Sequence, residues 1–146
     1  MGETSEEHGL YGIGEAAARS GTSERALRYY QEIGLLTPCA RTPGGMRRYS
    51  EEDLARVAHI RELQSVLGLN LDEIAVVLTS EDRLGEIKAA YKDTATDARK
   101  RAALVTESLE LQERLRETVK AKQAALEEFL SDLDGRIART KALLDK

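Results

Sequence analysis

Cysteine and aromatic residues are scarce in this chain of 146 residues, which holds one Cys, one Phe and no Trp. The single cysteine, Cys39, excludes an intramolecular disulfide, a cysteine-rich metal site and a cysteine-ligated iron–sulfur cluster. With so few aromatic side chains, any hydrophobic core must be mostly aliphatic.

Long apolar runs and a targeting segment are also missing. No stretch of eighteen or more apolar residues exists, so we expect no membrane-spanning helix and no membrane partner. Residues 1–9 are polar and acidic, unlike a secretory signal, and we expect them to form a flexible tail. These absences predict a cytoplasmic protein.

The formal net charge of −4 does not indicate a nucleic-acid-binding protein, but the charge is unevenly distributed. Between Arg19 and Arg48 there are six arginines and two glutamates, a local charge of +4. Attraction to phosphate depends on such a local patch more than on the total charge. Arginine also favours bidentate contacts to phosphate and guanine.

Residues 13–34 read as two short helices joined by a tight turn. A run of three alanines favours a first helix that ends at Ser20, and Gly21 suits a left-handed turn. Ser23 is the candidate N-cap of the second helix, which begins at Glu24. This pattern is typical of the helix-turn-helix, whose second helix lies in the DNA major groove.

The second helix has an apolar and a basic side. Leu27 and Tyr30 follow the helical period and predict a buried stripe, whereas Arg25 and Arg28 share a face and can point outward together. Taken alone, the two arginines could equally belong to a solvated surface.

A basic hairpin follows and favours DNA contact over mere solvation. A turn signal at residues 42–45 has Arg41 before it, and after it come Met46, Arg47, Arg48 and Tyr49. A small basic hairpin after a helix-turn-helix is typical of the wing of a winged-helix domain. Its arginines would meet phosphates or a minor groove.

The next segments predict a helical scaffold. Ser50, followed by three acids, is a candidate N-cap for a helix over 50–67, whose apolar period is given by Leu54, Val57, Ile60 and Leu63. Asn70 is a candidate N-cap for a short helix over 71–78. Residues 81–93, polar and interrupted by Gly85, are expected to form a linker. A further short helix within this linker is an alternative.

From residue 94 the pattern becomes that of one long helix, since residues 97–130 contain neither Gly nor Pro. Its apolar positions recur at spacings of four and seven, close to a coiled-coil seam. The candidate dimerisation residues are Leu104, Leu111, Leu115, Val119, Leu126 and Leu130. Such a stripe needs a partner helix, which would be a second copy of the chain or a hairpin partner within it. Gly135 is expected to kink or end the helix.

Several of these residues together resemble the MerR family of bacterial transcription regulators. The resemblance covers about the first eighty residues and rests on residues 68–74 and on Leu27-Arg28-Tyr29-Tyr30, Ile33-Gly34-Leu35-Leu36, Pro38, Arg41, Gly45, Arg47 and Tyr49. It implies a mainly α protein with a winged helix-turn-helix domain and a small β wing at 10–80. A long dimerisation helix would follow at 94–146 and pair with its copy as an antiparallel coiled coil.

The resemblance also implies roles for individual residues. Arg25 and Arg28 would face the major groove, and Arg41 and Arg47 would clamp phosphates from the wing. Of the two adjacent tyrosines, Tyr30 matches the DNA-facing position better. The full set expected at DNA is Ser23, Arg25, Arg28, Tyr29, Tyr30, Arg41, Gly45, Met46, Arg47 and Arg48.

Departures from the family narrow the mechanism. Met46 stands where the family often has Tyr or His, and because Met cannot donate a hydrogen bond, it would either pack against a sugar or lose the phosphate contact. Metal-sensing members carry cysteines that residues 93–101 lack, so no metal and no cofactor is expected. Cys39 could be a single-thiol sensor or an incidental loop residue. No separate effector domain is expected, and a small-molecule effector remains unidentified, although a site near Tyr91 or Phe129 is conceivable.

The expected function is a sequence-specific DNA-binding transcription regulator. As a homodimer it would bind a palindromic promoter site and distort the spacer so that RNA polymerase engages both promoter elements. The alternatives are a ligand-independent repressor or architectural DNA-binding protein, and a coiled-coil adaptor with secondary DNA binding. An enzyme is not expected, because the sequence has no Ser/His/Asp, paired-carboxylate or phosphate-loop constellation.

Overall fold

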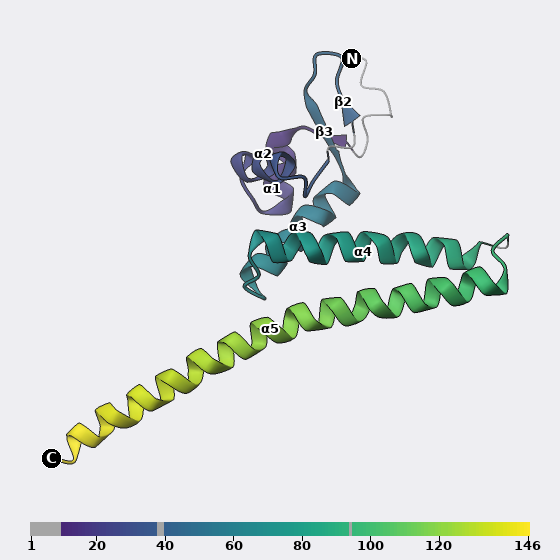
Figure 1. The fold of residues 1–146 in the computed structure, drawn as a ribbon. Helices are drawn as coiled ribbons and strands as arrows, with labels where there is room; N and C mark the ends of the chain where they lie inside the picture. The colour runs from purple at the N-terminus through teal and green to yellow at the C-terminus, as the bar shows by residue number, and fades with distance from the viewer. Residues whose placement is uncertain (1–9, 38–39, 94) are drawn as a thin grey trace. The chain divides into compact units, whose positions relative to one another are not determined.

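The computed structural model describes residues 10–37, 40–93 and 95–146 (Figure 1). It forms two compact units, of which the first ends at Ala75 and the second begins at Val76. The boundary falls within a single helix, so the backbone passes from one unit to the other without a loop.

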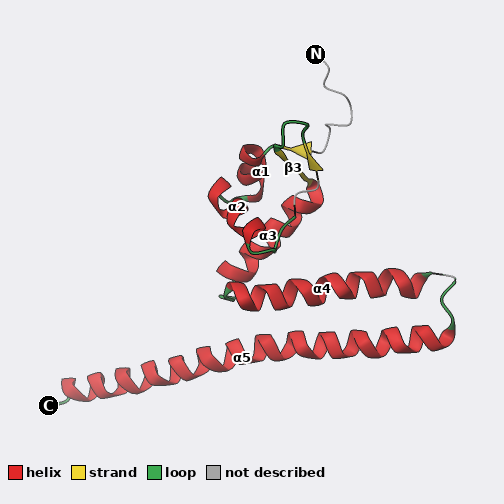
Figure 2. Ribbon diagram, turned by 45° about the horizontal axis from the view of Figure 1, so that its top comes forward, coloured by secondary structure: helices red, strands yellow, loops and turns green. Residues whose placement is uncertain are grey.

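The first unit is the winged helix-turn-helix that the sequence predicts. Its elements are β1 (Leu10–Tyr11), α1 (Ile13–Ser20), α2 (Glu24–Glu32), β2 (Ala40–Arg41), β3 (Arg47–Ser50), α3 (Glu51–Ser65) and the first turn of α4 (Leu71–Lys92). The strands form an antiparallel sheet with β3 in the middle (Figure 2). Sequence analysis does not predict β1, because a two-residue strand is too short to show an alternating pattern.

The turn between α1 and α2 forms for the predicted reasons. Gly21 has a φ of 72°, in the left-handed region that side chains disfavour, and ends α1. The hydroxyl oxygen of Ser23 accepts a hydrogen bond of 3.1 Å from the amide of Ala26, which confirms the N-cap of α2.

The helices behind this pair are also capped as predicted. Ser50 and Asp53 exchange side-chain hydrogen bonds with each other's backbone amides, at 3.1 and 2.9 Å, and start α3. Asn70 and Glu73 form the same reciprocal pair, at 2.8 and 2.9 Å, where α4 begins. The core of the unit is aliphatic except for two tyrosines; its most buried residues include Ala16, Leu27, Tyr30, Tyr49, Leu54, Val57, Ile60 and Ile74.

In the second unit, the stretch predicted to be a linker is helical. Helix α4 does not stop near residue 78 but continues through residues 81–92 to Lys92. Gly85 in a helix interior costs only about 1 kcal/mol relative to Ala. Burial of Ile87, which is 3% exposed, contributes more stabilising free energy than Gly85 costs, so the helix continues.

Helix α5 (Ala98–Leu144) confirms the predicted long helix but not the break at Gly135, through which it passes without interruption. Its start is capped by Asp97, whose carboxylate accepts a 2.8 Å hydrogen bond from the amide of Lys100. The guanidinium of Arg83 in α4 holds the two carboxylate oxygens of Glu107 in α5, at 2.6 and 2.9 Å. Residues 76–92 and the first half of α5 therefore form a helical hairpin.

Candidate nucleic-acid interface

The exposed side of α2 carries side chains that do not pack in the core of the first unit. Arg25, Arg28 and Tyr29 are exposed, and Tyr29 keeps 48% of its surface in solvent. They line a hollow of about 630 Å³ together with Ser23, Ala26 and Glu32. Cationic and aromatic groups on one helix face can contact both phosphates and base edges.

The wing presents a second group of cations. Arg41 on β2 and Arg47 on β3 are partners across the hairpin. The turn between them is closed by hydrogen bonds of 2.8 Å from Gly45 to Thr42 and from Thr42 to Met46. Gly45 has a φ of 86°, so a larger residue would be strained there.

Arg28 connects these two groups. A second hollow, of about 260 Å³, is lined by Ile13, Arg28, Arg41, Gly45, Met46 and Arg47. Arg28 is therefore shared between the hollow along α2 and the hollow at the wing. The structure thus brings the basic residues of α2 and of the wing onto one continuous surface.

Gln31 and Tyr49 fix the wing strand to α2. Tyr49 is fully buried, and its hydroxyl accepts a hydrogen bond from Nε2 of Gln31. Arg47 lies two residues before Tyr49 and so leaves β3 on the same face. The sequence does not reveal this role of Gln31, because nothing distinguishes a structural glutamine from a solvated one on a polar helix.

The arginines of this surface are free to bind anions. Within the described ranges, Arg25, Arg28, Arg41 and Arg47 form no ion pair with a carboxylate, and Arg41 makes only a 3.4 Å contact to the carbonyl of Gly45. Arg19 differs, because it pairs with Glu15 at 3.1 Å and lies 4.5 Å from the ring centre of Tyr11. Guanidinium groups that line the same hollow without a carboxylate partner repel one another and would be stabilised by phosphate.

Tyr30 does not lie on this surface, which corrects its predicted role. Its side chain is 5% exposed, its hydroxyl donates a 2.9 Å hydrogen bond to Oε1 of Gln64, and burial raises its pKa. The reason is periodicity: Leu27 and Tyr30 are three residues apart and share the buried side of α2. Tyr29 is the exposed tyrosine.

Arg48 also lies apart from the two hollows. It alternates with Arg47 along β3 and so leaves the strand on the other face. One of its guanidinium nitrogens lies 3.5 Å from the position that a Cβ would occupy at Gly12.

The described residues give no metal site. Among residues 10–37, 40–93 and 95–146, no three His, Cys, Asp or Glu side chains are grouped to hold a metal ion, and His59 lies 4.0 Å from Glu62. Cys39 and the tail at 1–9 lie outside the described residues. In the same ranges, every helix is too short or too polar to cross a bilayer.

Comparison with known proteins agrees with this geometry. The family described as MerR HTH family regulatory protein matches residues 11–81. The chain is 46% identical over 67 residues to the HTH-type transcriptional regulator PA4778 of Pseudomonas aeruginosa, a match that covers 46% of this chain and 50% of that protein. It therefore spans about half of that relative.

Two other matches extend over most of the chain. The HTH-type transcriptional regulator YyaN of Bacillus subtilis is 31% identical over 130 residues, which cover 88% of each protein. A solved structure from Listeria monocytogenes, assigned to the MerR family, is 25% identical with a TM-score of 0.56 and covers 87% of this chain and 83% of its own. The chain belongs to the MerR family of helix-turn-helix transcription regulators.

Proposed function

We propose that this protein regulates transcription in the cytoplasm as a homodimer that binds a two-fold symmetric promoter site. The observation that carries the proposal is the shared position of Arg28, which joins the unpaired arginines of α2 to those of the wing. Arg25 and Arg28 would read the major groove, and Arg41 and Arg47 would hold the flanking phosphates. Tyr29, and not Tyr30, would be the tyrosine of α2 that contacts DNA.

The dimer is supported by the distribution of exposed apolar residues along α5. Of the predicted seam, Leu111 is buried within a single chain, and Leu104 and Leu115 are half-buried. The later residues Val119, Leu126 and Leu130 remain 46%, 62% and 57% exposed. The internal hairpin therefore uses the early part of the seam, and the part from Val119 onward remains for a second copy.

Antiparallel pairing of α5 with its copy would relate the two reading units by a two-fold axis. Two-fold symmetry in the protein predicts two-fold symmetry in the DNA site. If the two reading units bind the two ends of an overlong promoter spacer, they would distort the spacer at a deformation energy of about several kcal/mol. The distortion would align the two promoter elements for RNA polymerase.

The test is selection of fragments from the source genome with purified protein, followed by sequencing of the retained DNA. The expected result is enrichment of one palindromic sequence within promoters. The Arg28→Ala/Arg47→Ala double variant should lose the enrichment. A matched variant, Arg114→Ala/Arg136→Ala, removes the same charge from α5 and should retain it.

Two other results would contradict the proposal. A folded dimer that enriches no sequence at modest salt would favour a coiled-coil adaptor. Enrichment that survives the loss of Arg28 and Arg47 would place the DNA contact elsewhere. Among recovered sites, a palindrome over a transcription start within an ordinary spacer would favour simple repression over spacer distortion.

A further inference from the structure

A pocket lies in the helical hairpin of the second unit, and none of the residues assigned to DNA lines it. It has a volume of about 550 Å³ and is lined from α4 and α5 by Leu84, Ile87, Lys88, Tyr91, Lys92, Val105, Ser108, Leu109 and Gln112. This volume is typical of pockets that bind small molecules. We propose that it binds an amphipathic organic anion, with an apolar body and a single carboxylate-like head.

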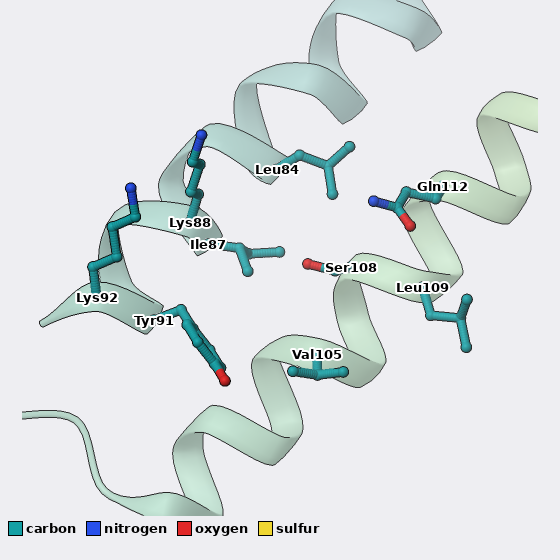
Figure 3. Close-up of a pocket in the computed structure, with 9 residues that line it drawn as sticks. All are labelled: Leu84, Ile87, Lys88, Tyr91, Lys92, Val105, Ser108, Leu109 and Gln112. Atoms are coloured by element: carbon teal, nitrogen blue, oxygen red, sulfur yellow. The ribbon is translucent and has the colours of Figure 1, made fainter.

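The pocket has an apolar floor and sides. Leu84, Ile87 and Tyr91 project from α4 toward α5 in Figure 3. Tyr91, Val105 and Leu109 keep 47%, 54% and 55% of their surfaces exposed, which is a large apolar area to leave in water. An apolar ligand body would gain free energy by covering these three side chains.

Polar groups inside the pocket favour a small ligand over a partner helix. In Figure 3 the side chains of Ser108 and Gln112 point back toward α4, between the apolar residues. Within the described part of the chain, neither side chain has a hydrogen-bond partner. A coiled-coil seam is filled by apolar residues, whereas a ligand pocket combines apolar walls with a few convergent polar groups.

Two lysines lie at the edge of the pocket, and in Figure 3 their side chains extend upward from α4 and not toward α5. Lys88 and Lys92 are four residues apart on the α4 side, so their ammonium groups repel each other. In the ranges that the structure describes, neither is paired with a carboxylate; the nearby Glu86 is held by Arg83 at 3.0 Å. A ligand head with negative charge would neutralise the pair, and the flexible lysine stems can reach it.

Tyr91 is held in place from the α5 side. The guanidinium of Arg101 lies 5.7 Å from the centre of the Tyr91 ring and donates a 3.2 Å hydrogen bond to the Tyr91 carbonyl. This end of the pocket is therefore preorganised, which lowers the cost of binding. Because α4 runs from this pocket into the first unit, occupation could alter DNA binding, and that consequence alone rests on the proposed function.

The test is isothermal titration of the full chain, without DNA, with two ligands that share a ten-carbon tail. Decanoate should bind at one site per protomer and at least about tenfold more tightly than decyltrimethylammonium. The double variant Lys88→Gln/Lys92→Gln should lower the affinity for decanoate by about tenfold or more, because two charged contacts are lost. The matched variant Lys120→Gln/Lys141→Gln should bind it like the original chain.

Equal affinity for the two heads, or unchanged decanoate binding in Lys88→Gln/Lys92→Gln, would overturn the proposal. So would absence of decanoate binding together with dissociation of the dimer by Val105→Gln/Leu109→Gln, since that result would make a second copy the occupant. The comparison of heads uses the unmodified chain and does not depend on variants that fail to fold. Loss of all DNA selection would overturn the proposed function while leaving the decanoate result intact.

Discussion

Arg28 is the side chain that belongs to both hollows of the candidate interface. We predict that Arg28→Ala lowers affinity for the selected site by about ten- to hundredfold and relaxes the base preference at one position, because a bidentate base contact is lost. Fluorescence anisotropy on single-base variants of the site measures both effects. Arg136→Ala, with the same change in charge, should bind normally.

Arg47 should behave differently, because its proposed role in the wing is to hold phosphate and not to read a base. We predict that Arg47→Ala weakens binding to the selected site and to unrelated DNA by the same factor. The slope of log affinity against log salt concentration should fall by about 1. A change in sequence preference without a change in the slope would show that Arg47 reads a base.

Tyr29 and Tyr30 are neighbours with opposite surroundings. We predict that Tyr30→Phe lowers the free energy of unfolding by about 1 kcal/mol, because the hydrogen bond to Gln64 is lost, and leaves DNA affinity unchanged. Tyr29→Ala should weaken DNA binding without lowering the thermal midpoint. Urea titration and anisotropy of both variants test this, and the reverse pattern would restore Tyr30 as the DNA-facing residue.

At the scale of elements, the predictable parts are those with local signals. Gly21, Ser23, Ser50 and Asn70 mark helix ends by side-chain chemistry, and each boundary forms where the sequence places it. The length of α4 depends on packing of Ile87 in the hairpin, and a contact so distant in sequence leaves no local pattern. The helical period of α2 predicts that Tyr29 and not Tyr30 is exposed, whereas the family resemblance favours Tyr30 as the DNA-facing residue.

The two helix-associated glycines give a paired prediction. Gly85→Ala should raise the free energy of unfolding by about 0.5–1 kcal/mol, because a Cβ there has open space and the helix backbone is already suitable. Gly21→Ala should lower it by at least about 1 kcal/mol, because its φ is left-handed and the Cβ would lie 2.7 Å from Arg61. Denaturant titration of both variants is the measurement. Destabilisation by Gly85→Ala would argue against a continuous α4.

The ion pair that ties α4 to α5 predicts a dependence on pH. The hydrogen bond from Arg83 lowers the pKa of Glu107, so the pair stabilises the hairpin at a pH above the carboxyl's unfolded pKa. That contribution is lost as the pH falls through the lowered pKa of the Glu107 carboxyl. Glu107→Gln should therefore lower the thermal midpoint at pH 7 but not at pH 3.

The exposed Glu110→Gln on the same helix serves as the control and should leave the midpoint unchanged at both values of pH. The effect at Glu107 should shrink in high salt, because both partners are exposed to solvent. A midpoint difference for Glu107→Gln that persists at pH 3 would show that the carboxylate charge is not its cause.

At the scale of the whole molecule, the chain combines a DNA-reading unit with a long helix whose apolar stripe is exposed from Val119 onward. The sequence shows the apolar repeat along α5. It does not show which of these residues pack against α4 and which remain exposed for a second copy. Whether a given leucine is covered by its own chain depends on where α4 ends. The pocket between α4 and α5 was equally hidden, because its residues come from two helices whose pairing the sequence leaves open.

The most direct test of the account is the mass of the complex that the protein forms on its recovered DNA fragment, measured by sedimentation equilibrium. We expect two protomers per duplex, bound to a palindrome. Leu126→Glu/Leu130→Glu, which places charge on the exposed stripe, should give a folded monomer that binds the duplex weakly. One protomer per duplex, or a dimer that survives these substitutions, would contradict the pairing of two reading units through α5.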